Sequence, residues 1–213
     1  MHLLAFLAPA LALASPAALP FFEAVTPPPD QITIIDTQTS GTGCPQGSVS
    51  TIFSPDRTIV TFGFDSFVAF IGPTSNPPDE TKNCQIHMSL KYPGGFQYSL
   101  MDATYHGFAQ LDPGVTGHFA STYYFSNNAS NTAKTNATIS GGDYVDGAQY
   151  TKHDVVAAAS VVWSPCGETG ILNVNNRIWL TALNRNQRGS LSDDDATVSF
   201  TQQVHIIWQA CRK

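Results

Sequence analysis

Hydrophobic and polar residues alternate over much of this chain, which is the pattern of β-strands that bury one face and expose the other. The clearest example is the stretch 83–111, in which Ile86, Met88 and Leu90 alternate with polar residues before a Pro-Gly-Gly turn at 93–95. A second strand follows this turn directly. We therefore interpret the stretch as the central hairpin of the fold.

The alternation on the return strand slips by one residue between Leu100 and Ala103, which predicts a β-bulge near Met101 and Asp102. Residues 153–163 contain alanines that suit a helix, but their valines and the terminal Trp163 favour a strand. Strands are also expected at 32–38, 49–53, 58–64, 67–71, 116–126, 171–183 and 196–211, and polar loops at 72–82, 127–149 and 184–195. Nine or ten strands without a convincing helix predict an all-β fold, an antiparallel sandwich of two sheets.

The N-terminal segment predicts export. Its apolar run from Leu3 to Ala14 ends in small residues, as in a secretory signal peptide, and prolines interrupt it too early for a membrane span. Cleavage is expected after Ala14 or after Ala17. We expect a signal peptide at 1–17, an extended lead-in and first strand at 18–40, and one β-sandwich domain at 41–213, with no membrane span.

Four cysteines in a chain routed to an oxidising compartment predict two disulfides. Three pairings are possible, and we favour Cys44–Cys84 with Cys166–Cys211, each closing a loop of about 40 residues. A zinc site is the alternative, but it needs more closely spaced ligands than these cysteines provide. Charged residues are 12% of the chain, the net charge is −6, and lysines and arginines do not cluster. Nucleic acid and acidic membranes are therefore not expected as partners.

Several segments resemble the fungal secreted proteins of the domain of unknown function 4360 family. The segments are GTGCPQGSVS, FDSFVAFIGP, KNCQIHMSLKYPGGFQYSL, ATYHGFAQLDPGV, STYYFS, SPCGETGILNVNNRI and QACRK. They cover nearly the whole chain from Gly41 to Cys211. The resemblance implies a small, secreted, cysteine-paired and β-rich fungal protein, and it implies no catalytic or binding residue.

Sequence motifs give little support for catalysis, and we expect no cofactor. The G-x-S-x-G motif of serine hydrolases is missing. The histidines His87, His106, His118, His153 and His205 follow no familiar metal-ligand spacing, and we expect them on solvent-facing strand positions. His2, which could otherwise supply an N-terminal copper ligand, would leave with the signal peptide. Weak calcium candidates lie in two acidic loops, namely Asp143, Asp146, Asp193 and Asp194.

Aromatic residues offer the best candidate for binding. Consecutive strand residues point to opposite faces, so one of Tyr123 and Tyr124 should face away from the core. With Tyr98, these two form a candidate aromatic surface on which a sugar could stack. Two N-glycosylation sequons, at Asn128 and Asn136, are expected in an exposed loop.

Three functions remain open at this point. We favour a non-catalytic secreted sandwich that binds a cell-wall or surface glycan, because aromatics are plentiful and catalytic motifs are missing. The first alternative is an effector-like module that binds an extracellular protein. The second is a hydrolase of unrecognised mechanism.

Overall fold

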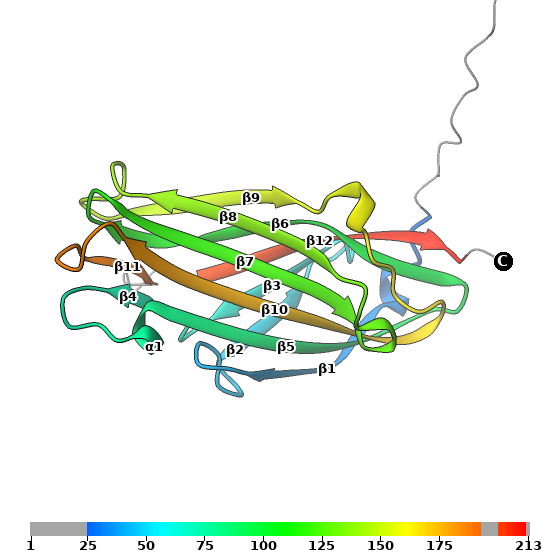
Figure 1. Ribbon diagram of the computed structural model, residues 1–213. Helices are drawn as coiled ribbons and strands as arrows, with labels where there is room; N and C mark the ends of the chain where they lie inside the picture. Colours follow the sequence, from blue (N-terminus) through cyan, green and yellow to red (C-terminus); the bar gives the residue numbers. More distant parts are fainter. Residues whose placement is uncertain (1–24, 193–199, 212–213) are drawn as a thin grey trace, which may run out of the picture.

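The computed structural model describes residues 25–192 and 200–211, which form two antiparallel β-sheets packed face to face (Figure 1). The predicted signal peptide at 1–17 lies outside these residues. The strands are β1 (Thr33–Ser40), β2 (Val49–Phe53), β3 (Ile59–Phe64), β4 (Ala69–Ile71), β5 (Thr81–Tyr92), β6 (Phe96–Leu111), β7 (Val115–Phe125), β8 (Ala133–Ser140), β9 (Ala148–Val155), β10 (Glu168–Ala182), β11 (Gly189–Ser192) and β12 (Phe200–Ala210). The predicted fold class is confirmed, although the described residues form twelve strands instead of nine or ten.

Each sheet contains strands from distant parts of the chain. We call the five-stranded sheet, in the order β1-β5-β10-β7-β8, sheet A. The seven-stranded sheet, sheet B, has the order β2-β3-β12-β6-β11-β4, with β9 paired to the other side of β6. Among the described residues, helical structure is limited to η1 (Pro29–Gln31), α1 (Pro77–Glu80), η2 (Ser126–Asn128) and η3 (Ala158–Ser160). No helix within the described ranges is long and apolar enough to cross a bilayer.

The alternation seen in the sequence separates the two faces of most strands. In β5, Ile86, Met88 and Leu90 are buried, while His87 lies on the outer face and is half-buried. The apolar side chains of both inner faces form one continuous core. Burial of these side chains stabilises the sandwich by roughly 1.5–3 kcal/mol for each large residue.

The β-bulge predicted on β6 is present at Met101. On the partner strand β12, His205 pairs with Asp102, but the next residue, Ile206, pairs with Leu100. The extra residue restores the inward phase, so both Leu100 and Ala103 are buried. The prediction from the sequence is therefore confirmed.

Three segments differ from the prediction. The polar stretch 127–149 contains β8 and the start of β9, and the loop expected at 184–195 contains β11. In β8 the inward positions include the small Ala133 and the polar Thr135, and β11 is only four residues long, which concealed the alternation. In the segment 153–163 the strand ends at Val155 and is followed by η3, because Ala157–Ala159 are exposed and offer no apolar face to bury.

Both favoured disulfides are present. Cys44 is bonded to Cys84 with 5.3 Å between the Cα atoms, and Cys166 to Cys211 with 5.7 Å. No free cysteine occurs in the part of the chain that the structure describes. These four sulfurs are therefore crosslinks, and the zinc alternative is wrong.

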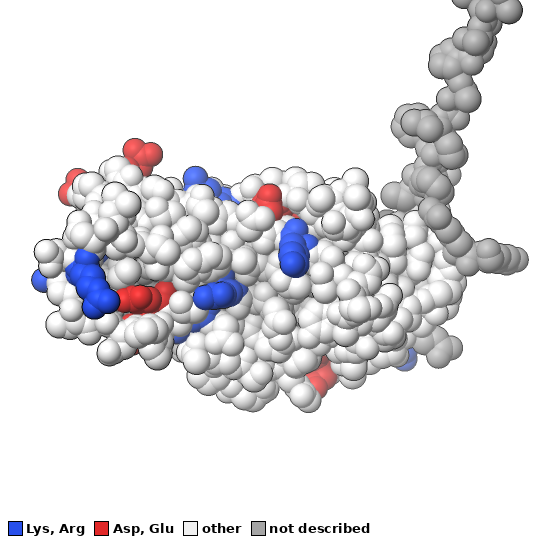
Figure 2. All heavy atoms as spheres, in the orientation of Figure 1, with Lys and Arg blue, Asp and Glu red and all other residues white. Residues whose placement is uncertain are grey.

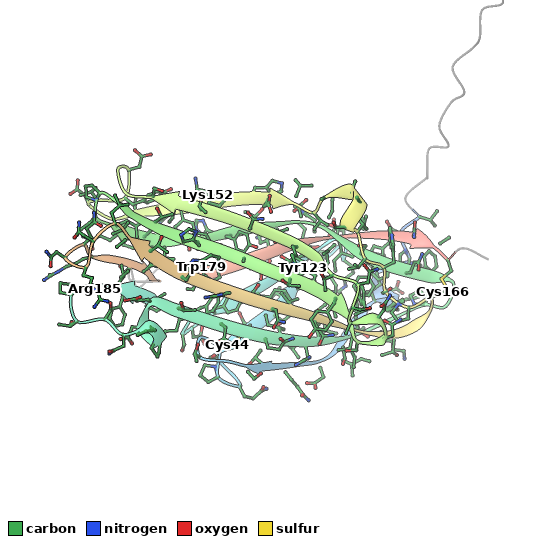
Figure 3. All side chains as sticks on the ribbon, viewed as in Figure 1. Cys44, Tyr123, Lys152, Cys166, Trp179 and Arg185 are labelled. Carbon is green, nitrogen blue, oxygen red and sulfur yellow. A yellow bond between two sulfur atoms is a disulfide. The ribbon has the colours of Figure 1, made fainter. Side chains whose placement is uncertain are left out.

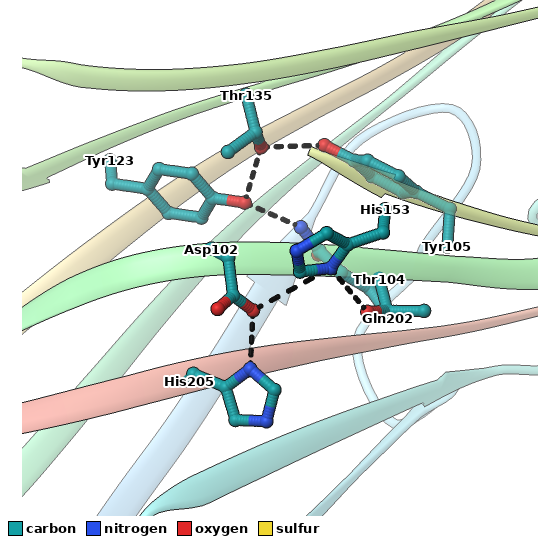
Figure 4. A network of polar contacts seen from close by, with 8 residues as sticks. All are labelled: Asp102, Thr104, Tyr105, Tyr123, Thr135, His153, Gln202 and His205. Atoms are coloured by element: carbon teal, nitrogen blue, oxygen red, sulfur yellow. Dashed lines mark hydrogen bonds and ion pairs between the residues drawn. The ribbon is translucent and has the colours of Figure 1, made fainter. Parts of the chain in front are cut away.

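A polar network crosses the middle of the core and joins the two sheets (Figure 4). Its members, all buried, are Tyr105, Ser121, Tyr123, Thr135, Asn176 and Gln202. The Gln202 amide nitrogen on β12 donates hydrogen bonds of 2.9 Å to Ser121 Oγ and to the Tyr123 hydroxyl on sheet A. Asn176 Nδ2 donates to Gln202 Oε1 at 2.7 Å. Because buried polar groups are costly unless paired, the network specifies how the two sheets align.

Tyr98 and Tyr123 provide a matched test of this energetic rule. The Tyr98 hydroxyl is buried without a hydrogen-bond partner among the described residues, whereas that of Tyr123 bonds Gln202 and Thr135. Burial raises the pKa of both tyrosines well above the ordinary value. We expect Tyr98→Phe to leave the free energy of unfolding unchanged or raise it by up to about 1 kcal/mol. Tyr123→Phe should lower it by about 1–2 kcal/mol in urea denaturation.

Each variant serves as the control for the other, because both remove one phenolic oxygen from the same core. A loss of stability in Tyr98→Phe as large as that in Tyr123→Phe would contradict the assignment of the hydrogen bonds.

Candidate functional site

The predicted aromatic surface does not form as expected. Tyr98 and Tyr123 lie in the core and are fully buried, so their predicted place on a binding surface is wrong. Tyr98 packs edge-on against Tyr92 and Phe125. Tyr124 faces outward from sheet A and is half-buried, as the alternation of Tyr123 and Tyr124 predicted.

The most exposed aromatic ring in the described chain belongs to Phe70, on the short strand β4, with 45% of its surface accessible. Its neighbours in sequence, Ala69 and Ile71, turn toward the core. Ser190 on β11 pairs with Phe70 on one side and with Gln110 on β6 on the other. The three residues thus form one cross-strand row on the outer face of sheet B.

This row forms the floor of a hollow of ≈ 560 Å³, which we call the Phe70 hollow. It is lined by Phe70, Ile71, Gly72, Pro73, Thr74, Gln110, Asp112, Arg188, Gly189 and Ser190. Its volume lies within the range of about 300–1,000 Å³ typical of small-ligand sites. An adjoining hollow of ≈ 470 Å³, which includes Glu80 and Arg185, shares the wall Ile71–Pro73. Figure 3 shows Arg185 at this end of the sandwich, opposite to Cys166.

Two hydrogen bonds join Asp112 to the backbone of Arg188 and fix the position of the Asp112 carboxylate. The Arg188 backbone N–H donates to Asp112 Oδ2 at 2.7 Å, and the Asp112 N–H donates to the Arg188 carbonyl at 2.9 Å. Within residues 25–192 and 200–211, no arginine or lysine forms an ion pair with a carboxylate. The Arg188 side chain lines the same hollow as the exposed Phe70 ring, and its guanidinium carries five N–H donors.

A third, smaller hollow of ≈ 340 Å³ lies on the outer face of sheet A. We call it the His87 hollow, and it is lined by Asp36, Gln38, His87, Ser89, Ser126, Ile171 and Asn173. Gln38, His87, Asn173 and Tyr124 pair in turn across β1, β5, β10 and β7. Since adjacent strands are about 4.8 Å apart, this row spans about 14 Å.

Hydrogen bonds fix the orientation of His87 in its hollow. Asn173 is nearly buried and donates from Nδ2 to Ser126 Oγ at 2.8 Å. Its Oδ1 therefore faces His87 Nδ1, at 2.6 Å, and accepts the proton of that nitrogen. In the neutral imidazole, Nε2 is then left as a hydrogen-bond acceptor. Gln38 Nε2 donates to Asp36 Oδ2 at 2.9 Å in the same hollow.

The other histidines lie on the outer faces of the strands, as predicted. His118 stacks on Trp179 with 4.7 Å between ring centroids, and Arg177 lies 5.0 Å from the Trp179 ring. Partial burial lowers the pKa of His118. Figure 2 shows positive and negative side chains spread over the face that carries β5, β10 and β7, with uncharged surface between them.

The bulge on β6 brings Asp102 between two histidines, an arrangement that the sequence spacing did not indicate (Figure 4). Asp102 accepts a hydrogen bond from Nδ1 of His205 and lies 3.9 Å from Nδ1 of His153. Thr104 Oγ1 lies 3.1 Å from the same nitrogen of His153. Across the described residues, no three histidine, cysteine or acidic side chains are placed to hold a metal ion. We therefore interpret the cluster as two hydrogen-bonded pairs, of which Asp102 with His205 joins β6 to β12 and Thr104 with His153 joins β6 to β9.

The remaining predicted sites that the structure describes lie at the surface. Asp143 and Asp146 are exposed in the loop before β9, whereas Asp193 and Asp194 fall outside the described residues. Both sequon asparagines are exposed, Asn128 at the end of η2 and Asn136 on β8. Asn136 therefore occupies a strand and not the loop that was predicted.

These features define a disulfide-linked antiparallel β-sandwich with a hollow on the outer face of each sheet. Residues 30–211 match the family model described as a domain of unknown function, DUF4360, and the chain belongs to this family. The resemblance seen in the sequence is confirmed. A relative from Arthroderma benhamiae, described as an uncharacterized secreted protein, is 46% identical over 185 residues, covering 87% of this chain and 74% of the relative.

Comparison with solved structures gives only weak matches. TmCBM61 in complex with beta-1,4-galactotriose has a TM-score of 0.26 at 9% identity, covering 83% of this chain and 90% of that one. The CBM22-1–GH10 modules of Clostridium thermocellum xylanase 10B, complexed with xylohexaose, have a TM-score of 0.23 at 10% identity, covering 85% and 29%. Similarity this low carries no inference about the ligand of this protein, which must come from its own residues.

Proposed function

We propose that this protein is an extracellular, non-catalytic glycan-binding protein and that the Phe70 hollow binds the glycan. The expected signal peptide, the two disulfides and the secreted relative support export. The observation that carries the binding proposal is the exposed Phe70 ring beside the side chains of Gln110, Asp112 and Arg188.

The chemistry of the hollow suits a polyhydroxylated ligand. A sugar ring has an apolar face that stacks on an aromatic ring, and its hydroxyls both donate and accept hydrogen bonds. Arg188 and the Gln110 amide offer donors, while Asp112 and the Gln110 carbonyl offer acceptors. Ser190 lies between Phe70 and Gln110 in the same row and adds a hydroxyl.

The first test is a pull-down of the secreted protein on insoluble β-1,3-glucan, chitin, cellulose and mannan. We expect retention on at least one of these polysaccharides. Passage of the protein through all of them would contradict the proposal. Turnover of a soluble substrate by the same preparation would instead favour the hydrolase alternative.

The Phe70→Ala variant tests the location of the site. We expect its affinity for a soluble oligosaccharide of the retaining polysaccharide to fall by about 30-fold, the effect of losing a central aromatic contact of about 2 kcal/mol. Isothermal titration calorimetry gives the affinity. Ile52→Ala is the matched control, because Ile52 is an exposed apolar residue of another strand in the same sheet and lies outside the hollow. Equal affinities of the two variants would place the site elsewhere.

A further inference from the structure

The His87 hollow has the properties of a second binding site for the same class of ligand. Its side chains present a carboxylate, two amides, an imidazole and two hydroxyls, a set that matches the alternating donors and acceptors of a sugar. The half-buried ring of Tyr124 continues the row beyond Asn173. Only 2% of the Asn173 surface is exposed, so this residue positions His87 and makes little direct contact with a ligand.

This second site is also built before any ligand arrives. The hydrogen bonds from Asn173 to Ser126 and from His87 to Asn173 fix the orientation of the imidazole ring. The hydrogen bond from Gln38 to Asp36 fixes the side-chain amide relative to the carboxylate. Polar groups held in advance lose less conformational entropy on binding. The smaller volume and the partly covered ring indicate weaker binding here than at the Phe70 hollow.

The two hollows lie on different sheets. Phe70, Ser190 and Gln110 are on the outer face of sheet B, and Gln38, His87 and Tyr124 are on the outer face of sheet A. The outer faces of a sandwich point away from each other, and the core separates them by the packed layer of about 10 Å plus the sheets themselves. A single polysaccharide segment bound in one hollow therefore leaves the other open to a second chain.

From this arrangement we infer that the protein is bivalent and crosslinks glycan chains, a role that rests on the proposed glycan binding. One molecule holds two polysaccharide chains on opposite faces, and long chains with many sites then join into a network. We commit the His87 hollow to a neutral glycan, because the Asp36 carboxylate in its lining would repel an acidic sugar.

The test measures binding and crosslinking separately on single-site variants. Calorimetry with β-1,3-glucan, xylan, mannan and chitin oligosaccharides should show one tighter and one weaker event in the unaltered protein. Phe70→Ala should keep only the weaker event, and His87→Ala only the tighter one. Gln38→Ala replaces an exposed residue of the same hollow, so it should weaken the weaker binding event several-fold without affecting the fold. This variant keeps the test valid if His87→Ala is unstable.

Crosslinking is measured as turbidity and pelleting with the corresponding long polysaccharides. The unaltered protein and the control His106→Ala, which lies outside both hollows, should pellet the polysaccharide, while both single-site variants bind it but leave it soluble. Crosslinking by His87→Ala or Gln38→Ala equal to that of the unaltered protein would overturn the inference, as would a single binding event in the unaltered protein. Neither outcome affects the proposed function. That proposal fails if the unaltered protein binds none of the probes, or if Phe70→Ala binds as tightly as Ile52→Ala.

Discussion

Replacing both Cys44 and Cys84 with alanine is expected to lower the free energy of unfolding by about 4 kcal/mol. The disulfide joins residues 40 positions apart, so its loss restores the conformational entropy of a long loop to the unfolded chain. Both cysteines are also buried, and their replacement removes packing around the start of β5. Urea denaturation without reductant, followed by fluorescence, measures the change.

The Cys166–Cys211 bridge provides the control for this prediction. Its sequence separation is 45, so the loop-entropy contribution differs from that of the first bridge by only about 0.1 kcal/mol. Cys166 is exposed, however, and its removal costs little packing. We expect Cys166→Ala with Cys211→Ala to lose somewhat less stability. A loss of under 1 kcal/mol in the Cys44 and Cys84 variant would contradict the crosslink as a main source of stability.

The second large effect is expected at the centre of the core network. Gln202→Ala should lower the free energy of unfolding by about 3–4 kcal/mol, because it creates a cavity and leaves buried polar groups unpaired. Asn176 Nδ2 loses its acceptor, and both Ser121 and Tyr123 lose a donor. Thermal and urea unfolding should both report the loss.

Gln203→Ala is the matched control, since Gln203 is the next residue on β12 but faces solvent. Its stability should remain within about 0.5 kcal/mol of the unaltered protein. If Gln202→Ala were equally mild, the network would be dispensable and the alignment of the two sheets would depend on apolar packing alone.

The prediction of the fold succeeded where inward positions are large and apolar. The alternation in β5 and β10 and the bulge at Met101 could be read from the sequence because buried apolar residues such as Met88, Leu90 and Val174 lie between polar neighbours. β8 was missed because one of its buried residues is Thr135, whose hydroxyl is satisfied by Tyr105 and Tyr123. Such a position looks exposed until the residues across the core are known.

The candidate sites were harder to predict. Phe67 and Phe70 lie three residues apart in one apolar run, yet Phe67 is buried and Phe70 is exposed. The periodicity of so short a strand does not distinguish them. Tyr98 and Tyr123 lie on long strands and were misplaced for a different reason, since a tyrosine suits the core and the surface equally well.

The amino-acid sequence alone determined the strand-rich class, the bulge, the paired cysteines and the family, because each depends on residue type and on spacing along the chain. Only the tertiary structure decided which aromatic rings are exposed, which polar residues meet inside the core, and that each sheet carries a hollow on its outer face. These features depend on strand order and register, which bring together residues far apart in sequence, such as Phe70 with Ser190 and His87 with Asn173. Local alternation specifies two faces for each strand, and the pairing of strands then decides what each face contacts.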